Sequence, residues 1–406
     1  MLANNMSVLE RKPLCQLSEG TLNSVNSNSS YNGKKDSLLY NYMSTISSYS
    51  DNSESTKVSS LNKLDIYADN TRSRSDDDDD DDTIKISDAD DMLDAFDESW
   101  CSASIEGYFY PIWNEKVFTK LEQISSKFAD KLPELDYQDC WDPFMEPDYS
   151  IEIFDYLREL EQKYSVDPTF IEQIQADLTW DDRKDLIAYV VKLQHKFRST
   201  LETLYLTVNI IDRFLSKVEV SVSKLELIAI TCFFIAAKYE EVYPPTMRHL
   251  IKISSNQFTS DVIREAERFI ITTLNFELNF CGPMSFLRRV SKADNYDLKI
   301  RTFAKYFTEI TLLDHRFIGS PQSWIASGAT YMAGKLLYED FEWTEEHIYY
   351  SGYTEEQLIP LMNIFKECCN DYKVHHMILF SKYSDKKFFY CAKYVQAYLS
   401  SNSALI

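Results

Sequence analysis

Glycine is scarce in this chain: only eight occur among 406 residues. That scarcity argues against a glycine-rich β-sandwich and against a doubly wound dinucleotide-binding sheet, because both use glycine in tight turns. The chain also lacks a G-x-G-x-x-G turn, a Walker loop and a G-x-S-x-G elbow, and its six histidines form no ligand pattern. We therefore expect no catalytic site, no cofactor and no metal site.

Three further absences narrow the class of protein. The eight cysteines show no C-x-x-C spacing, which indicates reduced intracellular thiols and not a disulfide framework or a zinc site. No apolar run is long enough to cross a bilayer, and the N-terminus lacks a basic-then-apolar signal peptide. Basic residues number 42 against 64 acidic ones, a net charge of -22 that disfavours nucleic-acid binding. We expect a protein of the nucleus and cytoplasm with no membrane or nucleic-acid partner.

An acidic, polar segment opens the chain. Residues 1–100 hold 20 acidic and 9 basic side chains and include the unbroken aspartate run Asp76–Asp82. Too little apolar surface is present to offset the entropy of ordering, so we expect 1–140 to be a disordered acidic regulatory tail. The aspartate run is either a solvated, self-repelling linker or a determinant that makes Ser73 and Ser75 targets of an acid-directed kinase.

Helical periodicity begins at Tyr149 and continues almost to the end of the chain. Residues 141–180 form a lead-in with an N-terminal helix, and no later stretch alternates with period two for long enough to predict a strand. The fold class is therefore all-α, with two tandem sets of about five helices over 181–279 and 280–400. The expected helices are 183–198, 202–215, 223–240, 246–252 and 259–274 in the first set, and 284–293, 298–314, 321–338, 354–372 and 386–399 in the second.

The helix L-E-L-I-A-I-T-C-F-F-I-A-A-K-Y-E-E (225–241) organises the first set. No residue from 227 to 237 carries a charge, so this helix is expected in the middle of a domain. It ends in Lys238, Tyr239, Glu240 and Glu241, followed by two prolines, and so presents a charged tip at one surface. The second set contains a similar small, apolar helix, S-W-I-A-S-G-A-T-Y-M-A-G-K (323–335), which favours two copies of one five-helix fold.

Longer motifs carry a family resemblance. The first set contains L-E-T-L-Y-L-T-V-N-I-I-D-R-F-L (201–215), F-I-A-A-K-Y-E-E-V-Y-P-P (234–245) and E-R-F-I-I-T-T-L-N-F-E-L (267–278), and the second contains P-M-S-F-L-R-R-V-S-K-A-D (283–294). D-P-F-M (142–145) and I-F-D-Y-L-R-E-L-E (153–161) match the family's lead-in. Over roughly 142–399 the chain resembles the B-type cyclins of fungi. The resemblance implies two cyclin boxes and a regulatory, non-catalytic subunit that binds and activates a cyclin-dependent protein kinase.

The resemblance also implies a kinase-binding surface. Lys238 and Glu267 match its polar centre, and four residues match the apolar positions around it: Tyr239, Ile271, Phe276 and Leu278. The spacing fits, because Glu267, Ile271, Leu274 and Leu278 recur on one helix face and Lys238 lies at a helix C-terminus, where the dipole favours a cation. The alternative from spacing alone is that Lys238 merely ends a core helix and Glu267 is solvated.

A substrate-docking patch is the main departure from the family. Many cyclins read M-R-x-I-L-x-x-W on the first box helix, whereas this chain reads D-R-K-D-L-I-A-Y at 182–189. Leu186 and Tyr189 remain, but Asp182 and Asp185 replace apolar residues, and Lys192 and Glu226 lie at neighbouring patch positions. Carboxylates in an apolar cleft weaken the binding of Arg-x-Leu motifs and favour more basic ones.

Three smaller motifs complete the sequence-based expectations. R-K-P-L-C-Q-L-S-E (11–19) resembles a destruction box formed by Arg11, Leu14 and the polar Glu19, which implies recognition by a ubiquitin ligase. Arg213 is expected to pair within the first box. Ser320-Pro321 fits a proline-directed phosphosite and equally a helix start. A cyclin-box transcription factor and a helical scaffold without a kinase remain the alternatives.

Overall fold

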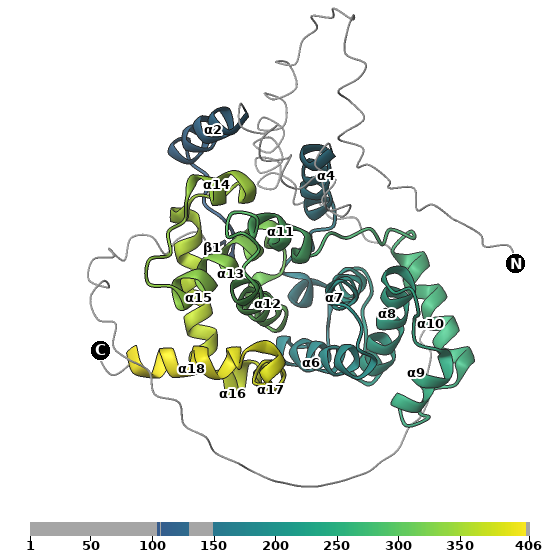
Figure 1. The fold of residues 1–406 in the computed structure, drawn as a ribbon. Helices are drawn as coiled ribbons and strands as arrows, with labels where there is room; N and C mark the ends of the chain where they lie inside the picture. The colour runs from purple at the N-terminus through teal and green to yellow at the C-terminus, as the bar shows by residue number, and fades with distance from the viewer. Residues whose placement is uncertain (1–103, 106, 130–148, 403–406) are drawn as a thin grey trace, which may run out of the picture. The chain divides into compact units, whose positions relative to one another are not determined.

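The computed structural model describes residues 104–105, 107–129 and 149–402 (Figure 1). All of them lie in one compact unit of the chain, residues 91–406. Helices dominate this part; the β structure within it is one antiparallel pair of two-residue strands, β1 (Ser104–Ile105) and β2 (Tyr108–Phe109). The aspartate run and the Arg11–Leu14–Glu19 motif lie outside the described residues.

The first box is built around α8 (Leu225–Glu240). Every residue from Ile228 to Ala237 is buried, as expected for a helix that is apolar all round. Three of its neighbours pack directly against it, which puts α8 at the centre of the box. The remaining helices of this box are α6 (Trp180–Phe197), α7 (Leu201–Leu215), α9 (Met247–Ile253) and α10 (Ser260–Thr273), with the 3-10 turn η5 (Val222–Lys224) before α8.

The second box has α13 (Gln322–Leu337) at its centre. Two glycines let neighbouring segments approach α13 closely: a Cβ at Gly328 would lie 2.3 Å from Leu361, and one at Gly334 would lie 2.4 Å from Phe341. The other elements of this box are α11 (Pro283–Val290), α12 (Leu298–Leu313), η6 (His315–Phe317), α14 (Glu345–Ser351), α15 (Glu355–Asn370), α16 (Tyr372–His375), α17 (Met377–Tyr383), η7 (Lys386–Phe388) and α18 (Cys391–Asn402).

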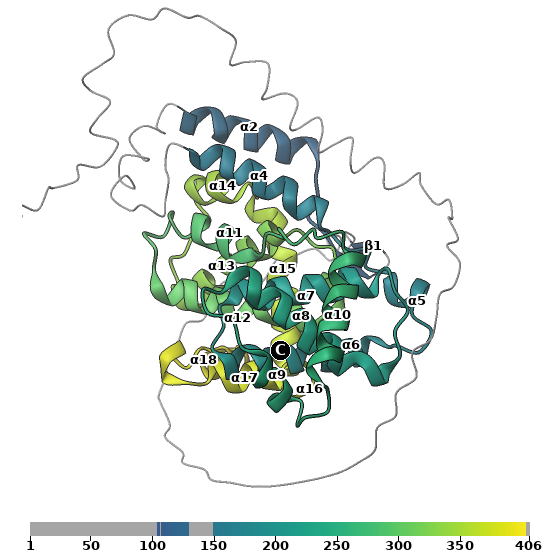
Figure 2. The ribbon, with the colours of Figure 1, turned by 90° about the vertical axis from the view of Figure 1, so that its right-hand side faces the viewer.

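Among the described residues before the first box are three helices: α2 (Glu115–Ala129), α4 (Ser150–Lys163) and α5 (Phe170–Ile174). Figure 2 shows α2 and α4 across the top of the second box, near α14 and α11. The expectation that 1–140 is a disordered tail is wrong for 107–129. Apolar residues there recur at helical spacing, and the resulting helix packs on α14 through Phe128, whose ring stacks on Tyr349 at 4.9 Å.

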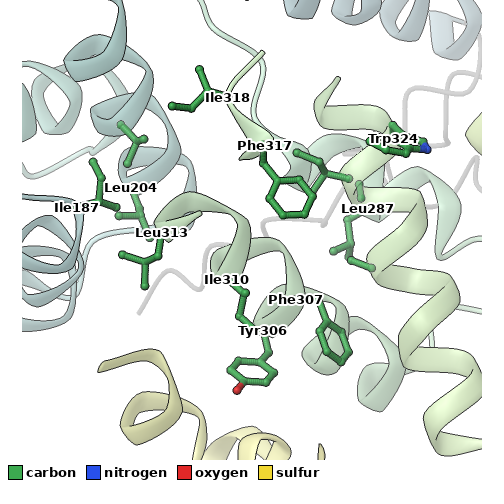
Figure 3. Close-up of a cluster of buried hydrophobic side chains, with 14 of the residues drawn as sticks. Ile187, Leu204, Leu287, Tyr306, Phe307, Ile310, Leu313, Phe317, Ile318 and Trp324 are labelled. Carbon is green, nitrogen blue, oxygen red and sulfur yellow. The ribbon is translucent and has the colours of Figure 1, made fainter. Parts of the chain in front are cut away.

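One hydrophobic core runs through both boxes (Figure 3). Ile187 of α6 and Leu204 of α7 lie beside Leu313 of α12, and the same cluster continues to Phe307 and Trp324. A smaller cluster, which includes Leu193, Phe233 and Ile263, belongs to the first box alone.

The all-α class and the two tandem boxes are confirmed. Short helices were missed, because α5, α14, α16 and α17 have seven residues or fewer and show too few periods to detect. Ser320 is buried and donates a hydrogen bond to the Phe109 carbonyl (2.6 Å), so it is not an accessible phosphosite. Within the described part, no helix has the length and hydropathy needed to cross a bilayer.

Candidate partner-binding surface

Lys238 and Glu267 form an ion pair at one surface of the first box. Lys238 lies in the last turn of α8 and Glu267 near the middle of α10, and these two helices pack together. The Lys238 side chain is 40% exposed and the Glu267 side chain 16% exposed, so the pair is open to solvent on one side. Pairs of this kind stabilise a fold by only about 0–1 kcal/mol. The pair therefore contributes little to the stability of the fold, and its charged groups are available for contact with a partner.

The four apolar residues expected at this surface differ in exposure. Tyr239 and Phe276 are exposed, whereas Ile271 and Leu278 are partly buried and pack against the main core. The ammonium of Lys238 also lies 4.2 Å from the centre of the Phe234 ring. Lys238 and Tyr239 of α8 thus lie on a helix that packs on α10, which carries Glu267 and Ile271. The kinase-binding role of the whole set stays a prediction. Exposed aromatic residues around a partly desolvated charge are typical of interface anchors.

Phe276 owes its position to an unusual backbone turn. Asn275 and Phe276 both have positive φ, 54° and 61°, and the Phe276 amide donates to the Ile271 carbonyl (3.0 Å). Asparagine tolerates this conformation, but a phenylalanine in it is strained. The turn leaves the Phe276 side chain 73% exposed. It also shows that the predicted continuous helix face was wrong for Leu278, because α10 ends at Thr273 and the turn places Leu278.

Arg213 holds the segment that follows this turn. Its guanidinium donates to the Glu277 carbonyl (2.8 Å) and lies 4.6 Å from the centre of the Tyr164 ring. Arg213 is buried, so its expected role of pairing within the box is confirmed. The surface at Phe276 is therefore supported from beneath by α7 and by the residue that follows α4.

The loop after α8 adds apolar residues that sequence reasoning missed. Val242 and Tyr243 are 85% and 93% exposed, directly after the ion-pair helix. Glu241 fixes the base of this loop, because its carboxylate accepts hydrogen bonds from the Thr200 amide (2.7 Å) and the Thr203 hydroxyl (2.6 Å) at the start of α7. The two following prolines were the available indication that this loop is stiff and projecting.

The outer face of α4 was also missed. Tyr149, Ile153 and Tyr156 lie on this side of the helix, and all three are exposed. This face adjoins the Phe276 segment, because the Asn279 amide donates to the Tyr156 hydroxyl (3.4 Å). The sequence did indicate this second face, because α4 carries apolar residues on two sides and a helix that packs on one core needs only one apolar side.

The docking-patch residues are not equivalent in the structure. Asp182 belongs to a capping box at the start of α6, where hydrogen bonds from Thr179 lower the pKa of its carboxyl. Leu186 is buried, and Asp185 and Lys192 are exposed. The Tyr189 hydroxyl donates to Glu226 (3.2 Å), and burial together with that carboxylate raises the pKa of Tyr189. Asp182 thus has a structural task of its own, and the docking role of the set stays a prediction.

One cluster in the described residues combines atoms that bind metals. Ligand atoms of Asp314, Cys368 and His375 lie within 4.8 Å of one another. Arg316 donates to both oxygens of Asp314, and its Nη2 atom lies 3.8 Å from the Cys368 sulfur. Burial raises the pKa of Asp314, but hydrogen bonds from His375 and Arg316 outweigh it and bring that pKa below its usual value. The guanidinium already supplies the positive charge that this carboxylate needs.

Comparison with protein-family models gives two adjacent matches. The model described as "Cyclin, N-terminal domain" matches residues 152–279, and "Cyclin, C-terminal domain" matches 281–397. Together they cover the lead-in helix α4 and both boxes, but not α2.

Curated relatives extend this result. The chain is 44% identical to G2/mitotic-specific cyclin-4 of Candida albicans over 71% of its own length and 59% of that protein. It is 40% identical to G2/mitotic-specific cyclin-4 of Saccharomyces cerevisiae, over 72% of this chain and 64% of that one. It is 38% identical to G2/mitotic-specific cyclin cig2 of Schizosaccharomyces pombe, over 72% of each. The alignments thus span about three fifths of the first relatives' length.

Proposed function

The chain belongs to the cyclin family, and on that premise we propose that it binds and activates a cyclin-dependent Ser/Thr protein kinase to control cell-cycle progression. Phosphoryl transfer in protein kinases requires a Lys–Glu pair and a correctly placed activation loop. A partner that packs against the kinase's mobile regulatory helix selects the conformation in which both are in place. The chain itself contributes surface and no chemistry.

One observation supports this proposal: the partly exposed Lys238–Glu267 pair joins α8 and α10, and the exposed Tyr239 follows Lys238 directly. The pair supplies polar contacts at defined positions, and Tyr239 and Phe276 supply the area that association needs. Truncating one member of a charged pair that becomes desolvated on binding costs about 2–5 kcal/mol. That range corresponds to a loss of roughly 30-fold or more in affinity.

The test is a double substitution, Lys238→Ala with Glu267→Ala, in the full chain. Kinase capture in a pull-down is expected to be lost, while circular dichroism and the thermal midpoint stay close to those of the wild type. A matched control removes an exposed ion pair on the same helix α10, with Arg264→Ala and Asp261→Ala, and retains binding. Retained kinase binding by the first variant rejects the assignment of this surface.

Two rival functions make different predictions. A cyclin-box transcription factor needs a basic surface for DNA, and a helical scaffold needs no kinase. Histone kinase activity that co-purifies with the full chain, and disappears with the Lys238/Glu267 variant, supports the proposed function against both. DNA binding without kinase activity favours the first rival, and neither activity favours the second.

Turnover and location form a separate part of the proposal. Arg11, Leu14 and Glu19 supply a destruction-box pattern for a ubiquitin ligase, and the expected location is nucleus and cytoplasm. Substitution of Arg11 and Leu14 by alanine is expected to lengthen the half-life of the protein in late mitosis. An unchanged half-life removes the motif from the proposal without affecting the kinase-binding surface.

A further inference from the structure

The inner face of α4 is anchored on the second box through Glu161. This carboxylate is 8% exposed and accepts hydrogen bonds from the amide of Ser323 (2.8 Å) and from its hydroxyl (2.7 Å). Ser323 lies in the first turn of α13, where unpaired amides and the helix dipole favour a negative charge. The Ser323 hydroxyl also lies 2.8 Å from that of Tyr353. Glu161 therefore has a defined partner at the start of the central helix of the second box.

Arg158, one turn earlier on α4, is anchored at a helix end of the opposite polarity. Its Nη2 atom donates to the carbonyl of Ser351 (2.8 Å), the last residue of α14. The next residue, Gly352, has φ of 78°, and a Cβ there would lie 2.4 Å from the guanidinium. A carbonyl at a helix C-terminus favours a cation. The two charged residues thus contact complementary ends of two different helices.

A third contact completes this inner face. The Phe154 ring packs 6.1 Å from that of Phe286 in α11, and the Arg289 guanidinium lies 4.2 Å from the centre of the Phe154 ring. The side chains of Phe154, Arg158 and Glu161 follow one another at i, i+4 and i+7, which is one stripe of the helix. The opposite stripe carries the exposed Ile153 and Tyr156.

We propose that Arg158 and Glu161 are positioning residues through which the second box controls kinase affinity. They fix α4 on the second box and so align its outer apolar face with the Lys238–Glu267 surface of the first box. The proposal rests on the proposed kinase-binding function. The second box then contributes to kinase affinity by holding α4 in place. An α4 that is loosely held carries the same side chains but binds more weakly, because it must lose conformational entropy when the kinase binds.

The experiment compares Glu161→Ala with Glu161→Gln and Glu309→Ala in the full chain. Glutamine accepts a bond from the Ser323 amide and donates one to its hydroxyl, so it keeps the contact without the charge. Glu309 is a matched control: it is a fully buried carboxylate of α12, paired with Lys382 and Tyr383 and separate from α4. The readouts are hydrogen exchange of residues 150–163 in the free protein and the kinase dissociation constant.

Glu161→Ala is expected to speed exchange over 150–163 and to weaken kinase binding at least tenfold. The kinase dissociation constant of Glu161→Gln is expected to stay within threefold of that of the wild type. The folded molecules of Glu309→Ala are expected to bind the kinase with a dissociation constant in the same range. Unchanged kinase affinity in Glu161→Ala, or an equal loss in Glu309→Ala, overturns the proposal. Should Glu161→Ala not fold, Arg158→Met provides the same comparison from the more exposed anchor.

The two proposals fail in different ways. A wild-type chain that binds no kinase refutes the proposed function, and exchange over 150–163 then still tests whether Glu161 anchors α4. Normal exchange in Glu161→Ala, with kinase binding by the wild type intact, refutes the positioning role alone.

Discussion

Arg183 and Asp212 form a two-pronged ion pair in the interior of the molecule. The Nε and Nη2 atoms of Arg183 each donate to a different oxygen of Asp212 at 2.7 Å, and the two side chains are 4% and 8% exposed. The remaining nitrogen, Nη1, donates to the Leu312 carbonyl (3.2 Å) at the end of α12. A single guanidinium therefore links α6, α7 and the second box.

Replacing Arg183 with methionine is expected to lower the free energy of unfolding by about 3–5 kcal/mol, because Asp212 is left buried without a partner. Urea unfolding followed by circular dichroism measures this loss. Arg264→Met, which breaks the exposed pair with Asp261, serves as the control and is expected to cost no more than about 1 kcal/mol. Similar losses in both variants contradict the assignment of Arg183 as an interior link.

His376 is expected to make the stability of the fold depend on pH. It is buried against Tyr306 (2.8 Å), and burial, aided by His375 and Lys184, lowers its pKa to about 3. A histidine with a lowered folded-state pKa contributes stability above its unfolded pKa near 6.5, and this stability is lost as pH falls toward 3. From pH 7 to pH 5 the expected loss is about 2 kcal/mol.

His376→Gln keeps a polar partner for Tyr306 and removes the titration. The difference in unfolding free energy between wild type and variant is therefore expected to shrink between pH 7 and pH 5. Parallel pH profiles for the two proteins would show that His376 is not held neutral.

Gly328→Ala has two opposite effects on stability: a higher helix propensity and a steric clash in the core. In an exposed helix the change stabilises by about 1 kcal/mol. Here the added Cβ would meet Leu361 at 2.3 Å, and overpacking of a core costs about 1–3 kcal/mol, so we expect net destabilisation. The thermal midpoint of Gly328→Ala, alone and combined with Leu361→Ala, measures the coupling. A stabilised single variant would mean that α13 and α15 can move apart without cost.

Substitution of Phe276 is expected to weaken kinase binding without lowering the stability of the fold. Phe276→Gly relieves the left-handed backbone and removes an exposed ring, so stability stays level or rises by up to about 1 kcal/mol. Kinase affinity is expected to fall roughly 30-fold, the loss typical of an aromatic interface anchor. Denaturant unfolding and a kinase titration test the two effects. Unchanged affinity would place Phe276 outside the interface.

Asp185→Ile tests the altered docking patch. The exposed carboxylate is replaced by the residue type that many cyclins have there, so binding of an Arg-x-Leu peptide is expected to tighten about tenfold or more, measured by fluorescence anisotropy. Lys196→Ile, another exposed position of α6, is the control. No gain at Asp185 would indicate that this patch is unused or recognises another motif.

The long apolar helices were predictable because their periodicity is unmistakable. The uncharged run in α8 predicted a central helix, and its abrupt end placed Lys238 at a surface. Glu267 followed from the family motif, since charges at helix surfaces are otherwise commonplace. The contacts of buried Asp314 with Arg316 and His375 were not predictable, because His375 reaches Asp314 only through tertiary packing.

The missed features share a physical cause. The αL turn at Asn275 and Phe276 depends on a single asparagine, too weak an indication without a glycine. The helix α2 was hidden by the acidic composition that precedes it, although Val117, Leu121, Ile124 and Phe128 recur at helical spacing. Its partners on the second box, such as Tyr349, lie more than 200 residues away along the chain.

The core that joins the boxes also determines how the chain is expected to unfold. Since Ile187 and Leu204 share one cluster with Leu313 and Trp324, the two halves are expected to melt together. Force applied at either end of the two boxes is then expected to meet one cooperative barrier. A species with one box folded and the other unfolded is therefore not expected to accumulate, and each molecule is expected to unfold as a whole.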